Sequence, residues 1–367
     1  MNPHLARIQP SLIRAINARK QPGDIDLGLG EPTLRPDPRP LQAALDWVRT
    51  NGCHYSPNAG FSELREAIAA RYGAPDTRAC VTVGSEEALY LAVKTLLDPA
   101  RDEVLIPEPC YPAYPKICAL EGVRSRTVGF SAESGFAPRA DRVLEALGPD
   151  TRLLILASPA NPTGRVWPEG ELRALAAGLL ERPGPPVWVL SDEVYRELYY
   201  TPEPPLSLAG LYPHTLVAGS LSKSCALTGL RLGWLIGPAE VITQAVTAHG
   251  LVNTAAGTIG QRAALAIFRE PALLAAHRPL YAAKREVLLQ AARRYGVEIV
   301  APEGAFYAMV HLPREQAAER LLEEQRVVTV PGHAFGSSAA GWLRVSWVAP
   351  DAALTEWLRR IGEFGSY

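Results

Sequence analysis

The sequence has 367 residues, and its 37 Lys and Arg nearly balance 38 Asp and Glu, which leaves a formal net charge of −1. This balance argues against nucleic acid or an anionic membrane as the main partner, and no apolar run approaches the roughly 18 residues that a membrane helix needs. Because the length exceeds what one hydrophobic core usually serves, we expect two domains in one globular chain.

The cysteines and the start of the chain bear on its location. An odd number of scattered thiols without a C-x-x-C pair suits a reducing cytosol. The first residues, Met1-Asn2-Pro3-His4, lead into a charged stretch with no apolar segment of the signal-peptide type. We therefore expect a cytoplasmic protein, and no metal site is predicted. The cysteines are Cys53, Cys80, Cys110, Cys118 and Cys225.

Residues 1–40 are rich in proline and are predicted to be irregular. They contain Gly28-Leu29-Gly30, but the run continues Glu31-Pro32-Thr33, so the G-x-G-x-x-G dinucleotide-binding fingerprint is absent. Gly30 is then either an ordinary turn residue or a position where the backbone must approach a ligand closely.

A helix is predicted to open at Ser62 and to carry Leu64, Ile68 and Tyr72 on one apolar stripe. It follows the segment Tyr55-Ser56-Pro57-Asn58-Ala59-Gly60. Taken alone, Tyr55 would be a half-buried aromatic residue.

The segment Val81–Ser85 predicts a strand and a turn, and Glu86-Glu87-Ala88-Leu89 predicts the first turn of a helix. Free amides and the helix dipole make such a turn an anion site, although Ser85 also fits a plain N-cap. Glu86 and Glu87 oppose an anion here unless their side chains turn away.

Four further apolar runs are predicted to be buried strands, and each is followed by polar or aromatic residues. In an open α/β sheet such strand ends form the edge that binds ligands. The runs and the residues after them are 103–106 with Tyr111, 153–157 with Asn161-Pro162-Thr163-Gly164, 187–190 with Asp192 and Tyr195, and 215–219 with Ser220-Leu221-Ser222-Lys223.

Asp192 stands at the inner end of its apolar strand, where a carboxylate is costly unless it is paired. A protonated pyridine nitrogen would pair it, and backbone donors around an ordinary buried aspartate are the alternative. Arg344 poses the same question in the apolar strand pattern of residues 342–347. Its partner is either a carboxylate of the chain or a bound carboxylate.

Lys223 is one of only five lysines, whereas arginine supplies most of the positive charge. A lysine amine with a depressed pKa forms Schiff bases with carbonyl compounds. Ser220, Ser222 and Arg231 beside it have the donors that hold a phosphate. A solvated lysine on a polar loop is the alternative. After Lys223 we predict a helical stretch through about residue 270, a long helix over 271–295, and strands at 304–307 and 342–347.

The pattern S-x-S-K at Ser220–Lys223, with T-G-x-R-x-G at Thr228–Gly233, resembles the lysine segment of fold-type I pyridoxal-phosphate (PLP) enzymes, specifically the class I/II aminotransferases. N-P-T-G at Asn161–Gly164 is among the most specific local patterns of that family. The resemblance implies an α/β fold of three αβα layers with a mostly parallel seven-stranded sheet and a smaller α+β domain. It places the large PLP-binding domain at 41–270 and the small domain at 1–40 and 271–367.

The resemblance also implies a role for each site residue. Lys223, Asp192 and Tyr195 are the catalytic residues, and Arg344, Gly30 and Asn161 bind the substrate α-carboxylate. Tyr111 stacks on the cofactor ring, Asp192 pairs with its nitrogen, and Asn161 and Tyr195 bind its 3-oxygen. The phosphate contacts are Ser220, Ser222, Arg231, the amides at Ser85 and Glu86, and Tyr55 of a partner subunit, which implies a homodimer.

These roles predict a PLP-dependent aminotransferase that moves an amino group between an L-amino acid and a 2-oxo acid by a ping-pong mechanism. A PLP-dependent carbon–sulfur lyase shares all of these residues and is the alternative enzyme. A PLP-binding regulatory module is a third reading, but the sequence shows no basic arm for DNA. The start of the chain, up to Pro10, weakly resembles N-succinyldiaminopimelate aminotransferases.

Overall fold

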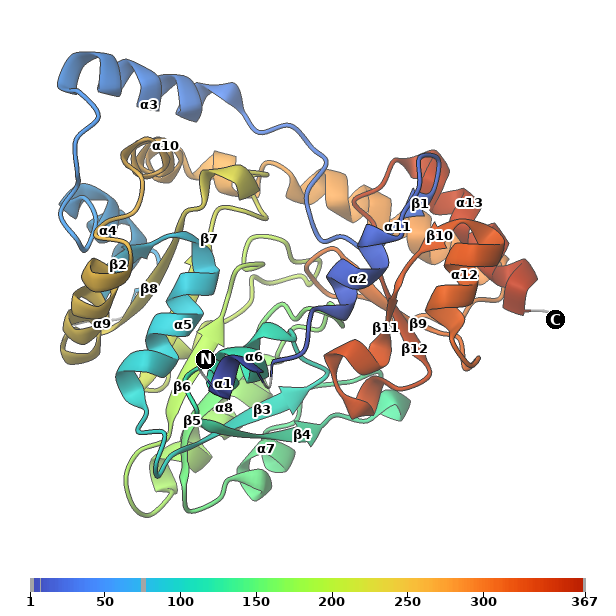
Figure 1. Cartoon of the computed structure of the whole chain (residues 1–367), viewed down its shortest axis with the longest axis horizontal. Coiled ribbons are helices and arrows are strands. Elements are labelled where there is room, and N and C mark those ends of the chain that lie inside the picture. The colour runs from blue at the N-terminus through green and yellow to red at the C-terminus, as the bar shows by residue number, and fades with distance from the viewer. Residues whose placement is uncertain (1–2, 7, 74–76, 366–367) are drawn as a thin grey trace.

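A sheet of seven strands forms the centre of the molecule, and a smaller unit lies at one side of it (Figure 1). This computed structural model describes residues 3–6, 8–73 and 77–365. In spatial order the strands are β2 (Thr77–Thr82), β8 (Gly233–Pro238), β7 (Thr215–Ser220), β6 (Trp188–Asp192), β5 (Thr151–Ala157), β3 (Glu103–Glu108) and β4 (Arg124–Gly129). Only β8 runs against its neighbours, so the predicted seven-stranded, mostly parallel sheet is confirmed.

Helices cover both faces of this sheet because its inner strands, such as β5, β6 and β7, are apolar on both sides. In β5, Leu153 and Ile155 pack with α5, α6 and α9, whereas Leu154 and Leu156 pack with α7 and α8 on the other face. The helices of this part are α3 (Pro38–Asn51), α4 (Ser62–Ala70), α5 (Gly84–Leu96), α6 (Ala113–Leu120), α7 (Ala140–Ala146), α8 (Glu169–Glu181), α9 (Ala239–Val252) and α10 (Thr258–Arg269). The predicted three layers are therefore present.

The smaller unit takes its core from both ends of the chain. Its three-stranded antiparallel sheet has the order β11, β12, β9, and β1 pairs with β10 in parallel. Leu27 near the start shares one hydrophobic cluster with Trp347 and Trp357 near the end. The elements are α2 (Leu12–Ala18), β1 (Ile25–Asp26), α11 (Arg278–Arg294), β9 (Tyr307–His311), α12 (Ala317–Gln325), β10 (Val327–Val328), β11 (Val330–Pro331), β12 (Trp342–Ser346) and α13 (Asp351–Gly365). The division at residues 41 and 271 stays a prediction.

Short helices complete the described part. The four-residue helix α1 (Pro3–Ala6) lies against α6, one of the helices that cover the large sheet. Met1, Asn2 and Arg7 of the opening stretch lie outside the described residues. The 3₁₀ helices are η1 (Ala132–Ser134), η2 (Leu208–Gly210), η3 (Thr228–Leu230), η4 (Pro271–Ala275), η5 (Gly332–Phe335) and η6 (Ser337–Ala339).

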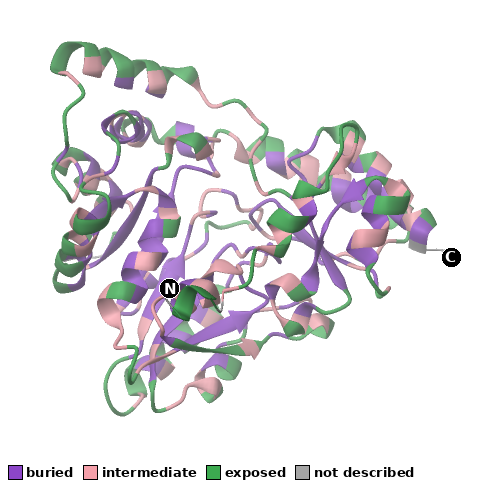
Figure 2. Ribbon diagram, viewed as in Figure 1, coloured by how far each residue is buried: buried purple, intermediate pink, exposed green. Residues whose placement is uncertain are grey.

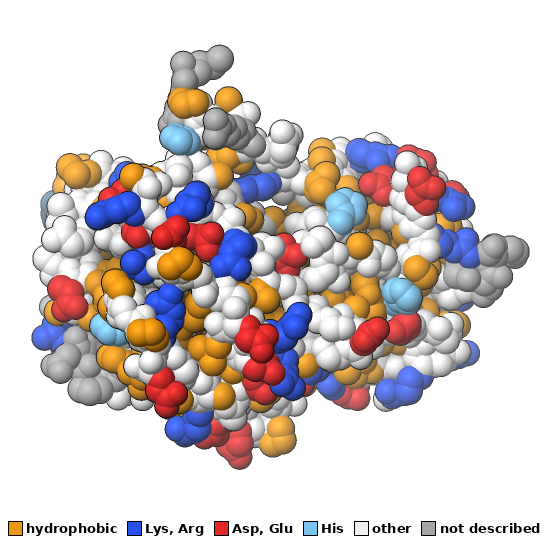
Figure 3. Space-filling view, turned by 90° about the horizontal axis from the view of Figure 1, so that it is seen from below, with side chains coloured by type: hydrophobic (Ala, Val, Ile, Leu, Met, Phe, Trp, Pro, Cys, Tyr) orange, Lys and Arg blue, Asp and Glu red, His pale blue; other side chains and the backbone are white. Residues whose placement is uncertain are grey.

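Burial and charge follow this layering. The central strands are buried, and the outward faces of the helices are exposed (Figure 2). On the face in Figure 3, acidic and basic side chains are interspersed rather than gathered into a field of one sign. None of the helices in the described ranges is long and apolar enough to cross a membrane.

The structure corrects three predictions and confirms one. The stretch after Lys223 is not helical throughout, because residues 233–238 form β8, which is buried between β2 and β7 and so lacks a helical period. The long helix begins at Arg278 rather than 271, after the 3₁₀ helix η4. Residues 1–40, expected to be irregular, contain α2 and β1. The helix at Ser62 is confirmed, and Leu64, Ile68 and Tyr72 are buried.

Candidate active site

The carboxyl ends of four parallel strands meet at one edge of the large sheet. Ala157 of β5 pairs with Asp192 of β6, which pairs in turn with Ala218 of β7. Lys223 follows β7, and its Nζ donates a hydrogen bond to the Gly30 carbonyl at 2.8 Å. A segment from the beginning of the chain thus closes over the lysine at the strand ends.

Asp192 is a buried carboxylate without a cation. Its side chain accepts hydrogen bonds from the Tyr114 hydroxyl at 2.7 Å and from the Val194 amide at 3.2 Å. No Lys, Arg or His of the described residues forms an ion pair with it, and the residue is 6% exposed. Burial raises its pKa to about 6, although both hydrogen bonds act in the opposite direction.

Arg344 is the matching buried cation, on β12 of the smaller sheet. Its Nη1 donates to Asn161 Oδ1 at 3.1 Å and its Nη2 to the Gly28 carbonyl. The guanidinium carbon lies 4.5 Å from the centre of the Tyr307 ring and 4.9 Å from that of Phe335. Nε has no partner in the described part of the chain, and no carboxylate there pairs with this arginine. The salt-bridge alternative is therefore wrong for the described residues, and the guanidinium, 2% exposed, has no counter-charge there. The predicted role of Arg344 as a carboxylate clamp stays a prediction.

Two tyrosine hydroxyls lie beside this arginine. The hydroxyl of Tyr195 donates to that of Tyr307 at 3.0 Å, and both residues are buried. A Cβ built on Gly30 would stand 1.6 Å from the Tyr307 oxygen, so glycine is required there. The tyrosine, rather than a ligand alone, thus explains the absence of a side chain at residue 30.

Sequence reasoning missed Tyr114 and Tyr307 as site residues. Tyr114 follows Tyr111 by three residues, and its hydroxyl is 78 positions away in sequence from its partner Asp192. Tyr307 closes the segment Gly304–Tyr307, which we interpreted only as a strand. The motif Gly304-Ala305-Phe306-Tyr307 did not by itself indicate a contact with the site, because its partner Tyr195 lies 112 positions away in the sequence.

The predicted anion end lies at the start of α5. Val83 is the N-cap residue, and Gly84 follows with a φ of 78°. A Cβ on Gly84 would lie 2.6 Å from Nη2 of Arg231, so this guanidinium sits directly over the turn. Arg231 itself has a left-handed φ of 50° and donates from Nη1 to the Thr228 carbonyl at 3.0 Å. An arginine over a helix N-terminus is suited to an anion.

The two serines before the lysine form a local network. The Ser220 hydroxyl donates to the Leu232 carbonyl at 2.7 Å and lies 2.8 Å from the Ser222 hydroxyl. Both side chains are buried. Ser220 therefore links the lysine loop to the chain before β8, and its predicted contact with a phosphate stays a prediction.

The two glutamates of the anion turn behave differently. Glu87 turns back, and its Oε2 accepts a hydrogen bond from the Val83 amide at 2.6 Å. Glu86 instead stays in the site, where its Oε2 accepts from the Tyr111 hydroxyl at 3.3 Å. Its side chain reaches solvent, yet the surrounding protein raises its pKa by desolvation. The objection raised by Glu87 is thus removed, whereas that raised by Glu86 remains.

Among the predicted site residues, Tyr55 does not lie with the others within a single chain. Its side chain is 88% exposed, and it makes no side-chain hydrogen bond within the described ranges. Its predicted contact with the site of a partner subunit stays a prediction.

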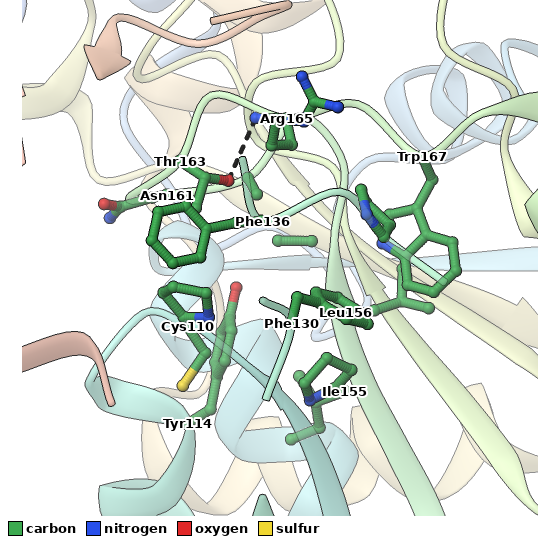
Figure 4. Close-up of a pocket in the computed structure, with 15 residues that line it drawn as sticks. Cys110, Tyr114, Phe130, Phe136, Ile155, Leu156, Asn161, Thr163, Arg165 and Trp167 are labelled. Carbon is green, nitrogen blue, oxygen red and sulfur yellow. Dashed lines mark hydrogen bonds between the residues drawn. The ribbon is translucent and has the colours of Figure 1, made fainter. Parts of the chain in front are cut away.

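A small cavity lies beneath the Asn161–Gly164 loop. It has a volume of about 30 Å³ and is lined mainly by apolar side chains, including Phe130, Phe136 and Trp167 (Figure 4). The loop above it is held by a hydrogen bond from the Arg165 amide to the Thr163 hydroxyl at 3.2 Å. The space has room for about one water molecule and is far below the several hundred Å³ of a ligand pocket. It is a packing gap behind the site.

Comparisons with known proteins agree with this geometry. The model of the family described as "Aminotransferase class I and II" matches residues 22–361. A probable aspartate/prephenate aminotransferase of Thermus aquaticus is 34% identical over 97% of this chain and 97% of its own. A probable N-acetyl-LL-diaminopimelate aminotransferase of Bacillus subtilis is 33% identical over 99% of this chain and 95% of its own.

A solved structure shares the whole fold. The aspartate aminotransferase from Thermus thermophilus, solved with maleate, matches with a TM-score of 0.91 and 33% identity over 99% of each chain. The fold is therefore that of the fold-type I enzymes. All three relatives carry aminotransferase names, which favours amino-group transfer over carbon–sulfur lyase chemistry.

Proposed function

The chain belongs to the aminotransferase class I and II family, and on that premise we propose that it carries pyridoxal 5′-phosphate on Lys223 and exchanges an amino group between an L-amino acid and a 2-oxo acid by a ping-pong mechanism. The observation that carries this proposal is Asp192. A buried carboxylate with two donors but no cation is costly, and the protonated ring nitrogen of the cofactor would supply the missing charge.

The residues around Asp192 fit the remaining parts of the cofactor. Arg231, Ser222 and the turn at Ser85 and Glu86 would hold the phosphate. Tyr111 would stack on the ring, and Tyr195 and Asn161 would bind its 3-oxygen. When bound, the cofactor supplies an electron sink for the negative charge that develops at the substrate α-carbon.

The chain's own residues supply orientation and proton transfer. Arg344 has a free Nε and would clamp the substrate α-carboxylate, with Asn161 fixing the guanidinium from one side. The Lys223 amine would take the proton from the substrate α-carbon and return it later as general base and acid. In the cofactor-free chain the Gly30 carbonyl accepts a hydrogen bond from this amine, which keeps the lysine at the strand ends.

We further propose a homodimer in which Tyr55 reaches the phosphate of the partner subunit. Exposed apolar side chains beside it support this assembly. Leu251 at the end of α9 is 86% exposed, and Val252 is exposed as well. The adjoining Gly250 lies against Asn58 of the Tyr55 loop, since a Cβ there would be 2.4 Å from Asn58 Nδ2. A second copy would remove this patch from water.

A cytoplasmic location is the last part of the proposal. All five cysteines are free thiols, and Cys53 alone among them is exposed. Such thiols persist in a reducing compartment.

Trapping the lysine tests the proposal. After addition of pyridoxal phosphate, borohydride should fix the cofactor to the peptide that contains Lys223. Lys223→Ala should lose at least the roughly 10²–10⁴-fold that general acid–base catalysis contributes. Lys116→Ala is the matched control, because Lys116 lies on the surface and its amine donates a hydrogen bond to the Pro10 carbonyl at 3.5 Å. A label on Lys94 or Lys116 would overturn the assignment.

Single half-reactions test the reaction type. Because relatives with different named substrates share the fold, a panel of L-amino acids is required. An accepted amino acid alone should give one equivalent of 2-oxo acid per site and then stop, and a second 2-oxo acid should restart turnover. Sustained release of pyruvate from one sulfur amino acid, with no 2-oxo acid added, would show a lyase instead.

A further inference from the structure

A buried polar cluster lies behind the anion turn and is not used by the proposed chemistry. It joins Glu87 of α5 to His249 and Asn253 at the end of α9. His249 Nδ1 lies 2.8 Å from Glu87 Oε1, and Asn253 Nδ2 donates to the same oxygen at 2.7 Å. His249 is 0% exposed, and its Nε2 has no partner in the described part of the chain.

The cluster is connected directly to the turn. The second oxygen of Glu87 accepts a hydrogen bond from the Val83 amide at 2.6 Å. Val83 is the N-cap residue of α5, and the next residue is Gly84, beneath the Arg231 guanidinium. One carboxylate therefore ties the backbone of the turn to the end of a helix more than 160 residues away in sequence.

Burying Glu87 and His249 between α5 and α9 costs the free energy of removing both side chains from water. Burial alone would raise the pKa of Glu87, but the hydrogen bonds from His249, Val83 and Asn253 outweigh it and hold the pKa below its usual value. The carboxylate is thus ionised and turned away from the face of the turn. Apolar side chains of similar size would fill the space without the desolvation of an acid and a histidine.

The end of α9 also contacts a second segment that we assign to the phosphate. Gly250, next to His249, lies against Asn58 in the loop that carries Tyr55. The helix end therefore stands between the turn of its own subunit and the loop directed to a partner.

We propose that Glu87, held by His249 and Asn253, is a positioning residue that sets the Val83–Ser85 turn in the conformation that binds the cofactor phosphate. This inference rests on the proposed function, which puts that phosphate at the start of α5. The physical reason is preorganisation: donors that are fixed before binding lose less free energy when the anion arrives. Glu87 does not touch the cofactor and acts through the Val83 amide.

The test compares two ligands that differ only in the phosphate. Dissociation constants of pyridoxal 5′-phosphate and of pyridoxal are measured for the full chain by titration of the bound chromophore. The dissociation constant of pyridoxal divided by that of pyridoxal 5′-phosphate reports what the phosphate contributes to binding. For Glu87→Ala this ratio should fall roughly tenfold, as expected when hydrogen bonds to a charged group are weakened. The constant for pyridoxal itself should change little. Glu87→Gln keeps an acceptor for the Val83 amide and should restore part of the ratio.

A matched control is the exposed pair of Glu298 and His311, whose oxygen and Nδ1 lie 2.7 Å apart. Glu298→Ala should leave the ratio unchanged. If Glu87→Ala does not fold, Asn253→Ala removes one bond at a helix end and should lower the same ratio about threefold. An unchanged ratio in every variant that folds, or an equal loss for both ligands, overturns the inference. A wild-type protein that binds both ligands equally overturns instead the phosphate site of the proposed function.

Discussion

The site contains two buried groups of opposite charge, one from each sheet. Asp192 ends β6 of the large sheet, and Arg344 lies within β12 of the small one. Neither forms an ion pair with a described residue. Asp192 is held by the donors of Tyr114 and Val194, whereas Arg344 is held by the acceptors of Asn161 and Gly28. Each is oriented by the chain but left without a counter-charge.

The difference between them lies in what burial does to each charge. Burial raises the pKa of Asp192 to about 6, so its charge depends on pH and on what binds. Burial also lowers the pKa of Arg344, but a guanidinium remains charged in proteins. The charge of Asp192 can thus be adjusted by pH, whereas Arg344 is a permanent cation. Under the proposed function the first would pair with a protonated ring and the second with a carboxylate.

We expect the largest effect from Asp192→Asn, which removes the charge that pH can adjust. A raised native pKa means that Asp192 stabilises the cofactor-free protein fully below about pH 3.8, the ordinary value, and that this stability is lost as pH rises through about 6. The difference between a pKa of about 6 and the ordinary value of 3.8 corresponds to about 3 kcal/mol. Asp192→Asn keeps an acceptor for Tyr114, so it should raise the free energy of unfolding at pH 8 by up to about 3 kcal/mol while abolishing transamination.

Urea unfolding of the cofactor-free protein between pH 4 and 8 measures this difference. Asp150→Asn is the control, because Asp150 is an exposed carboxylate paired with Arg124. A variant at Asp192 that is less stable than the wild type at pH 8 would contradict the comparison.

We expect the next largest effect from Arg344→Ala, which removes the permanent positive charge. Arg344→Ala should weaken binding of both the amino acid and the 2-oxo acid, since each carries the same carboxylate. Loss of a charged hydrogen-bonded pair costs about 1.5–3 kcal/mol, or roughly ten- to a hundredfold in affinity. Arg344→Lys keeps the charge but not the planar fork and should lie in between.

Half-reaction titrations with both substrates measure these affinities, and cofactor affinity checks that the fold is intact. Arg320→Ala removes an exposed arginine on α12 and should change neither substrate. Unchanged binding of both substrates to Arg344→Ala would show that this arginine is structural.

We expect the smallest effect from Tyr307→Phe, which distinguishes the role of the Tyr307 ring from that of its hydroxyl. Tyr307→Phe keeps the ring under Arg344 but removes the oxygen 3.0 Å from the Tyr195 hydroxyl. A neutral hydrogen bond contributes about 0.5–1.5 kcal/mol, so kcat should fall about two- to tenfold with little change in substrate affinity. Steady-state kinetics give both values. A loss of substrate affinity as large as that in Arg344→Ala would mean that the hydroxyl, not the ring, serves the arginine.

The sequence by itself indicated four buried strands of the large sheet and the polar or aromatic residues that follow them. Apolar runs that end in Asn161, Asp192 and Lys223 show a parallel sheet with one working edge, since all parallel strands end on the same side. The family resemblance then assigned roles that spacing alone left open. The strand β8 escaped prediction because Gly233, Gly237 and Pro238 leave it an apolar run of only three residues, Trp234-Leu235-Ile236.

Only the tertiary structure decided which of these charges lack a partner. The sequence shows no partner for either Arg344 or Glu87. In the structure no described carboxylate pairs with Arg344, whereas Glu87 is bound by His249 and Asn253. The pairing depends on segments more than 75 positions apart, such as Tyr114 with Asp192 and Tyr195 with Tyr307. The first distance follows from how α6 packs on the large sheet and the second from how the two sheets lie together, and no local pattern encodes either.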